Sequence, residues 1–216
     1  MFPHIELHRS SVGYEAIYDR KWETSMMHTQ AQLAALSEDR IDIGICWQPD
    51  LVPGLDCHLL AKCPFVAILK EDDPLAEHDV VTMADLRNRE IVISSRVYNK
   101  WIDAKVRWAM SRAGLIPSGV DEVSEYDQIA FHIAASGAVG IHQATIALTN
   151  RIPGITFRLL DDPSLQLDIC AVVRSRSTDA QLNSVVQLLG LAAAEGFCQA
   201  TDLLERARSA GTLQNS

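Results

Sequence analysis

The chain has 216 residues, enough for one large domain or two small lobes with a buried core. Its composition, 48% hydrophobic and 22% charged, is that of a globular protein and excludes a disordered chain. The formal net charge of −9 disfavours binding of this chain alone to nucleic acids or anionic membranes, because like charges repel. The chain has no apolar run of about 20 residues, the length that a transmembrane helix requires. Its first residues lack a signal-peptide pattern. We therefore expect a cytoplasmic protein with no membrane partner.

The spacing of apolar residues predicts strands and helices in alternation. We expect strands over residues 5–8, 41–46, 65–69, 91–93, 123–124, 140–141, 155–159 and 167–173. We expect helices over residues 24–36, 81–86, 99–113, 127–135, 145–150 and 178–193. Thr82 and Asp85 predict a weak capping box, and Gly114 with Pro117 beyond it predicts a helix end. This alternation predicts an α/β fold with mainly parallel sheets.

The common sequence patterns of catalytic and metal sites are missing. The seven histidines show neither HxxxH nor HxH spacing, which leaves a zinc site unsupported. No GxSxG elbow, GxGxxG loop or P-loop occurs. Five cysteines at irregular spacing, without a CxxC pair, are typical of reduced, partly buried cytosolic thiols. We therefore predict no enzyme activity, no metal and no cofactor.

Several segments, in order along nearly the whole chain, resemble the effector-binding domain of LysR-type bacterial transcription regulators. The matching segments are FPHIELH (2–8), LSEDRIDIGI (36–45), FVAIL (65–69), DDPLA (72–76), ADL (84–86), AGLIP (113–117), ASGAVGI (135–141) and LLDDP (159–163). No single segment is specific to the family, but the occurrence of all of them in the family's order and spacing is specific.

The resemblance implies two Rossmann-like lobes joined by two crossover strands, as in type 2 periplasmic binding proteins, with a ligand cleft between them. Lobe I would comprise residues 1–70 and 168–216, and lobe II residues 71–167. The crossings would lie near residues 69–74 and 160–167.

The resemblance also implies a function. A small effector, which we expect to be a carboxylate or other anion, would bind in the cleft and control transcription. The family further implies a homodimer or tetramer and contact with DNA only through an N-terminal winged helix-turn-helix domain missing from this chain. The alternative is a periplasmic solute-binding protein of the same fold. The run from residue 36 to residue 76 favours the regulator.

The chain departs from the family pattern at four places. Asp39 stands where the family has glycine, Asp73 where it has histidine, and Ala144 where it has proline. The chain also has extra residues between about 9 and 23, around Tyr14–Trp22, which are either an insertion or additional strand structure.

Ligands of open α/β sheets bind at the carboxyl ends of the strands and the amino ends of helices, where free N–H groups favour anions. That rule selects the candidate ligand-binding residues Thr24, Ser25, Trp47, Ser94, Ser95, Arg96, Asn99, Ser124, Tyr126 and His142. The same loops also carry Cys46, Gln48, Glu125, Asp127 and Gln143.

The strongest single candidate is the segment 94–96, where a helix N-terminus and the Arg96 guanidinium would hold an anion. The alternative is that these residues are polar caps facing water. Trp47 would either stack on an aromatic ligand or cover the end of the sheet. His142 would either donate to an effector or be a structural histidine. Trp101 and Trp108, on one predicted helix, are interpreted as core or dimer contacts.

Overall fold

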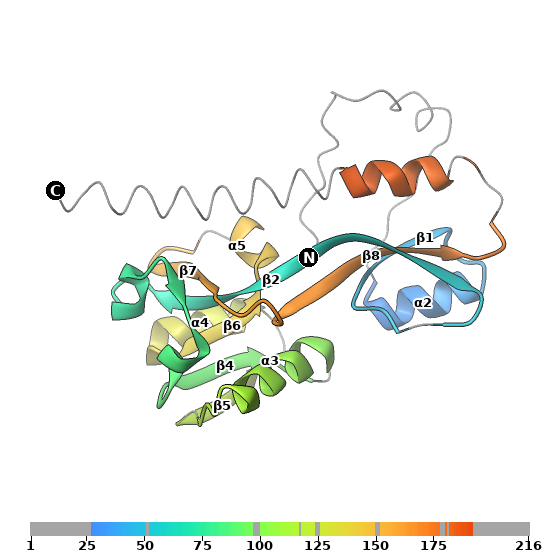
Figure 1. The fold of residues 1–216 in the computed structure, drawn as a ribbon. Coiled ribbons are helices and arrows are strands. Elements are labelled where there is room, and N and C mark those ends of the chain that lie inside the picture. The colour runs from blue at the N-terminus through green and yellow to red at the C-terminus, as the bar shows by residue number, and fades with distance from the viewer. Residues whose placement is uncertain are drawn as a thin grey trace. The chain divides into compact units, whose positions relative to one another are not determined.

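The structure, a computed structural model, describes residues 27–50, 52–96, 100–116, 118–123, 126–149, 152–177, 180 and 182–191. These residues form a mixed α/β fold of two compact units (Figure 1). The first unit contains residues 27–62 and 168–191, and the second contains residues 63–167. The predicted strand 5–8 and the extra segment around Tyr14–Trp22 lie outside the described residues. The lobe boundaries drawn from the sequence stay a prediction.

The first unit is a small sheet with a helix on each face. Its strands are β1 (Ile43–Trp47), most of β8 (Gln166–Arg174) and the first half of β2 (Leu55–Lys70), in the order β1–β8–β2. Strands β1 and β8 run antiparallel. Side chains alternate between the faces, so each face has its own apolar cluster. Helix α2 (Thr29–Ser37) covers Cys46, Cys170 and Val172, and the helix over residues 182–191 covers Ala171 and Val173.

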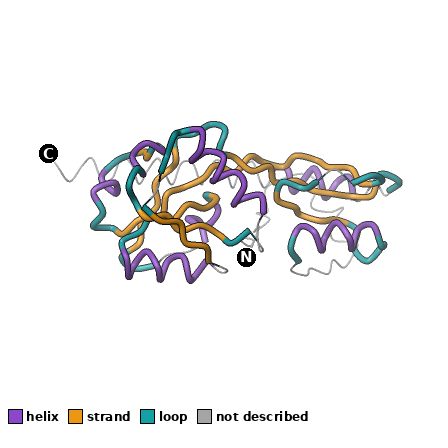
Figure 2. Tube along the Cα trace, turned by 90° about the horizontal axis from the view of Figure 1, so that it is seen from below, coloured by secondary structure: helices purple, strands orange, loops and turns teal. Residues whose placement is uncertain are grey.

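The second unit is built on a larger sheet. Strand β6 (Val139–Gln143) lies between β2 and β4 (Glu90–Ser94), and β5 (Gly119–Val123) pairs with β4. Strand β7 (Ile155–Leu160) pairs with β2 and with the short β3 (Val80–Val81). The helices are α3 (Lys100–Arg112), α4 (Tyr126–Ser136) and α5 (Thr145–Thr149), with 3₁₀ turns η1 (Pro74–Glu77) and η2 (Met83–Leu86). Figure 2 shows helices on both sides of these strands.

The sheet is mixed, so the expectation of mainly parallel sheets is wrong. Strand β4 runs parallel to β5 and β6, as strand–helix–strand units require. Strand β2, however, runs antiparallel to both β6 and β7. The sequence predicted only residues 65–69 of this strand, because its first half is largely exposed and has no apolar alternation. No described helix is long and apolar enough to cross a membrane.

Two local signals read from the sequence, the capping box and the helix end at Gly114, are confirmed. The helix predicted over residues 81–86 is instead the end of β3 followed by the 3₁₀ turn η2. Thr82 and Asp85 form the capping box at η2. Gly114 and Gly137 follow α3 and α4 with positive φ angles of 61° and 72°, the left-handed turn that ends many helices. Asp39 also has a positive φ, 58°. Glycine adopts this left-handed conformation without strain, and this chain adopts it with aspartate.

The other two substituted positions, Asp73 and Ala144, each make a defined contact. Asp73 is buried and forms a two-pronged ion pair with Arg89, and its carboxylate accepts the Leu75 N–H at 2.9 Å. Burial opposes ionisation, but the Arg89 guanidinium and that N–H hold the pKa of Asp73 below its usual value. At Ala144 the backbone N–H donates to the Pro64 carbonyl at 2.8 Å. Proline has no N–H and would lose this bond.

Gly140 allows α4 to pack directly on β6. A Cβ atom at this position would lie 2.7 Å from Ile133 Cδ1, 2.9 Å from Ile129 Cγ2 and 3.1 Å from Ile68 Cβ. Such distances are shorter than normal carbon–carbon contacts, so only a residue without Cβ fits unless its neighbours move. The close approach fixes the height of α4 above the sheet.

Candidate ligand-binding site

Polar side chains lie in a row at the carboxyl ends of the strands in the second unit. Ile93 pairs with Ile141, so Ser94 on β4 and His142 on β6 are the next residues along two neighbouring parallel strands. Ser94 and His142 are both 8% exposed. Ser95 follows and donates its backbone N–H to the Val123 carbonyl at 2.8 Å. The structure therefore brings the predicted Ser94, Ser95 and His142 to one edge of one sheet.

His142 is uncharged at neutral pH. Burial lowers its pKa from 6.5 to about 4, and a hydrogen bond with the Gln143 backbone opposes this effect only in part. A neutral imidazole has one donor and one acceptor nitrogen. This edge therefore presents hydrogen-bonding groups at His142 and Ser94 without adding a positive charge.

Three further polar groups of the second unit are buried. Gln143, opposite Phe65 of β2, has a buried Oε1 with no hydrogen-bond partner in the described part of the chain. Trp101 Nε1 on α3 is likewise buried and unpartnered within that part. Thr145, at the start of α5, is 7% exposed and hydrogen-bonds to the buried Cys63 thiol, whose pKa burial raises to about 11. Buried polar atoms that lack partners are costly, so Gln143 and Trp101 are candidates to bind a ligand or an ordered water.

Sequence reasoning did not propose Trp101 or Thr145 as binding residues and did not select Gln143. The interpretation of Trp101 as a core or dimer contact rested on its helical spacing, which does not show where the indole N–H lies. Gln143 directly follows His142, so the rule that ligands bind at strand ends had already pointed to this part of the chain. Trp108, by contrast, is 51% exposed, and the Arg112 guanidinium stacks on its ring at 4.8 Å.

Arg96 lies beside an acidic group. Its side chain is 76% exposed, and its Nε is 3.9 Å from the carboxylate of Asp103. Asp103 is almost completely buried and accepts a hydrogen bond of 2.6 Å from Arg107 Nε. An anionic ligand at Arg96 would have to compete with Asp103 for the guanidinium. The role assigned to Arg96 from the sequence is therefore still a prediction.

In the first unit, Trp47 is the last residue of β1 rather than a loop residue. It pairs with Ile169, and its backbone N–H donates to Thr29 Oγ1 at 3.1 Å. Gln48 follows with a positive φ of 42° and donates its N–H to the Asp168 carbonyl at 2.7 Å. The half-buried Trp47 side chain is thus held at a strand end.

Four predicted residues lie outside the described residues: Thr24, Ser25, Asn99 and Ser124. Tyr126 begins α4, but its side chain is not described.

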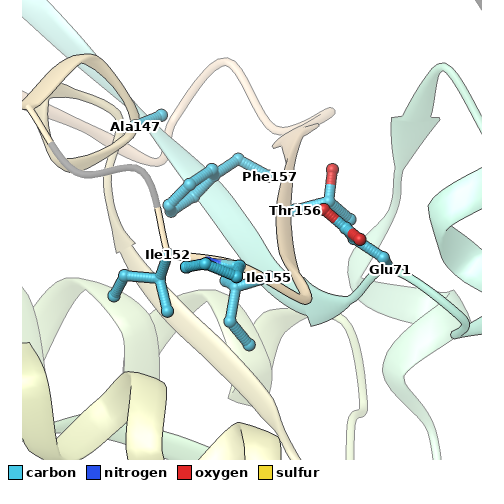
Figure 3. A pocket seen from close by; sticks show the side chains of 7 residues that line it. Glu71, Ala147, Ile152, Ile155, Thr156 and Phe157 are labelled. Carbon is cyan, nitrogen blue, oxygen red and sulfur yellow. The ribbon is translucent and has the colours of Figure 1, made fainter.

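A surface hollow of about 370 Å³ lies elsewhere in the second unit (Figure 3). Its lining is mostly apolar, with Ala147, Ile152, Ile155 and Phe157, while Glu71 and Thr156 lie together on one side. It contains none of the residues predicted from the sequence. Binding sites usually combine an apolar wall with several convergent polar groups, which this hollow does not have.

The mixed sheets define an α/β domain with buried polar groups at its strand ends. A family model described as the LysR substrate binding domain matches residues 20–193, so the chain belongs to this family. The resemblance recognised in the sequence is thereby confirmed.

Among curated proteins, the chain is 28% identical over 123 residues to the uncharacterized HTH-type transcriptional regulator YnfL of Escherichia coli. The match covers 57% of this chain and 41% of that protein, so the chain spans about two fifths of the length of this relative.

Two solved structures show the fold. The effector-binding domain of BenM with its effector benzoate matches with a TM-score of 0.76 and 23% identity, over 86% of this chain and 84% of that one. Full-length CbnR complexed with its target DNA matches with a TM-score of 0.68 and 20% identity, over 77% and 58% of the two chains. The predicted fold class, an α/β fold of the type 2 periplasmic-binding-protein kind, is confirmed.

Proposed function

We propose that this chain is the effector-binding regulatory part of a LysR-type bacterial transcription regulator. The observation that carries the proposal is the family match over residues 20–193. The relative in Escherichia coli is a transcriptional regulator, which favours a sensor over a periplasmic solute-binding protein. In this proposal the whole protein is a cytoplasmic homodimer or tetramer without enzyme activity, and it contacts DNA through an N-terminal winged helix-turn-helix domain.

The proposed effector is a small carboxylate. The neutral His142 and the hydroxyl of Ser94 can donate hydrogen bonds to carboxylate oxygens. Hydrogen bonds to a charged group are stronger than those between neutral groups, so a few donors suffice for recognition. The benzoate effector of BenM, a carboxylate, supports this choice of ligand class.

Effector binding regulates only if the ligand binds two conformations with different affinity. We propose that the carboxylate favours one arrangement of the two lobes, and that the paired subunits transmit this preference to their DNA-binding domains.

A ligand screen by thermal shift tests the proposal, with benzoate and aliphatic carboxylates set against benzamide and neutral sugars. We expect a carboxylate to raise the melting temperature and the neutral compounds to have little effect. With the best carboxylate, Ser94→Ala should weaken binding about tenfold or more, because one hydrogen bond to a charged group contributes about 1.5–3 kcal/mol. Ser111→Ala, an exposed serine on α3, serves as the matched control.

Two results would contradict the proposal. Stabilisation by neutral sugars or cations alone would exclude a carboxylate effector, and an unchanged affinity in Ser94→Ala would remove this strand end from the site. The carboxylate affinity of Arg96→Ala, measured in the same way, decides whether that guanidinium binds the anion or pairs only with Asp103.

A further inference from the structure

Three metal-ligating side chains converge on one face of the second unit. His132 Nε2 lies 3.2 Å from Glu90 Oε1 and 3.2 Å from Asp121 Oδ2. One ligand atom from each residue lies within 4.8 Å of those from the other two. The three residues come from β4, β5 and α4, so the fold rather than sequence proximity brings them together.

The register of the sheet explains why the two carboxylates share a face. Val92 of β4 pairs with Asp121 of β5, and side chains alternate along each strand, so Glu90 lies on the same face as Val92 and Asp121. The next residue, Glu122, lies on the opposite face and pairs with Arg107 of α3.

Helix α4 covers the face with the two carboxylates. Its residues Ile129 and Ile133 pack on Gly140, which brings His132 in the same turn close to the strands. The imidazole is thus held over two acidic side chains by the packing of its helix.

The charges at this cluster are unbalanced. Three other carboxylates in the second unit pair with an arginine: Asp73 with Arg89, Glu122 with Arg107 and Asp162 with Arg112. Within the described residues, the ion-pair partner of Glu90 and Asp121 is His132 alone, and neither pairs with a lysine or arginine. A cation bound among the three groups would balance them.

The distances suit a transition-metal ion. Zn²⁺ binds imidazole nitrogen and carboxylate oxygen at about 2.0–2.2 Å, which in a tetrahedral site places neighbouring ligand atoms about 3.3–3.6 Å apart. Both nitrogen–oxygen distances in the cluster, 3.2 Å, lie just below the lower end of this range. Glu90 and Asp121 are 39% and 51% exposed, so water has access to the remaining coordination positions.

We propose that Glu90, Asp121 and His132 form a binding site for a divalent transition-metal ion such as Zn²⁺. The imidazole and the two carboxylates supply three ligands, and water completes the coordination. The ion links β4, β5 and α4. This site is separate from the strand-end residues proposed to bind the effector and does not depend on that function. The sequence search for HxxxH and HxH spacing could not find it, because its ligands are far apart along the chain.

Titration of the untagged chain with Zn²⁺ at pH 7.5, followed by calorimetry, tests the site. Because the exposed Cys57 thiol binds the same ions, the experiment uses Cys57→Ser as the parent protein. We expect one saturable equivalent, weakened at least tenfold by His132→Ala and by Glu90→Gln. His58→Ala, at an exposed histidine on β2, should bind Zn²⁺ like the parent.

Co²⁺ provides a second readout. The proposed nitrogen and oxygen ligands give visible Co²⁺ absorption without the near-ultraviolet bands of a cobalt–thiolate bond. Melting curves without metal establish that each variant is folded, and Glu90→Gln keeps the side-chain shape if His132→Ala does not fold. Unchanged Zn²⁺ affinity in the folded variants, thiolate bands in the Co²⁺ complex, or no saturable binding would each overturn the proposal.

Discussion

Replacing His142 with glutamine should protect the protein against mild acid. The folded-state pKa of His142 is about 4, while the unfolded value is about 6.5, because burial removes water from the ring. The unfolded chain therefore binds the proton more tightly than the folded chain. The contribution of neutral His142 to the free energy of unfolding is fully present above pH 6.5 and is lost as the pH falls from 6.5 to 4.

The size of the loss follows from the two pKa values. At pH 5 the linkage relation gives a loss of about 2 kcal/mol, and at pH 4 about 3 kcal/mol, relative to pH 7.5. Below pH 4 both states are protonated, and the contribution of His142 changes no further. A loss of this size is a substantial part of the total stability of a typical domain, about 5–15 kcal/mol.

Urea unfolding followed by circular dichroism between pH 7.5 and pH 4.5 measures this effect. Wild type should lose about 2 kcal/mol more than His142→Gln between pH 7.5 and pH 5. His58→Gln, at an exposed histidine, is the matched control and should follow wild type. Equal losses in wild type and His142→Gln would refute the assignment of a buried, neutral His142.

Two further substitutions test the packing of the second unit. Gly140→Ala should cost about 1–3 kcal/mol in the free energy of unfolding, because its Cβ would lie 2.7 Å from Ile133 Cδ1. Arg89→Ala should cost about 3 kcal/mol, because it leaves the buried Asp73 carboxylate without its ion-pair partner. Urea unfolding at pH 7.5 measures both.

Each of these substitutions has a matched control. Gly119→Ala places a Cβ in strand β5 of the same sheet with a nearest contact of 3.9 Å, so it should be much less destabilising than Gly140→Ala. Arg40→Ala breaks an exposed pair with Glu38 and should cost no more than about 1 kcal/mol. If Gly119→Ala destabilises the protein as much as Gly140→Ala, the packing argument is wrong. If Arg40→Ala destabilises it as much as Arg89→Ala, the ion-pair argument is wrong.

Much of the local structure could be predicted from the sequence. The helix over residues 99–113 was expected from its apolar spacing and from Gly114, and the structure has α3 from Lys100 to Arg112. The strand ends that carry Ser94 and His142 were also found, because both follow short apolar runs of β-branched residues. Such signals depend on a few neighbouring residues, so they remain visible without the fold.

The direction and length of strand β2 could not be predicted in the same way. Its first half is exposed, so it has little of the apolar pattern that marks a buried strand. The antiparallel pairing of β2 with β6 depends on contacts between residues far apart in the chain. The neutral state of His142 likewise depends on burial by the surrounding fold.

The sequence by itself determined the family, the α/β class and the polar segments at the strand ends. These properties follow from local residue patterns and from the order of motifs along the chain. The tertiary structure decided which polar groups share a site. It placed Ser94 beside His142 through the register of β4 and β6, set Arg96 near Asp103, and gathered Glu90, Asp121 and His132. Strand register and helix packing determine which of these residues lie together, and neither can be predicted from residue spacing along a single chain.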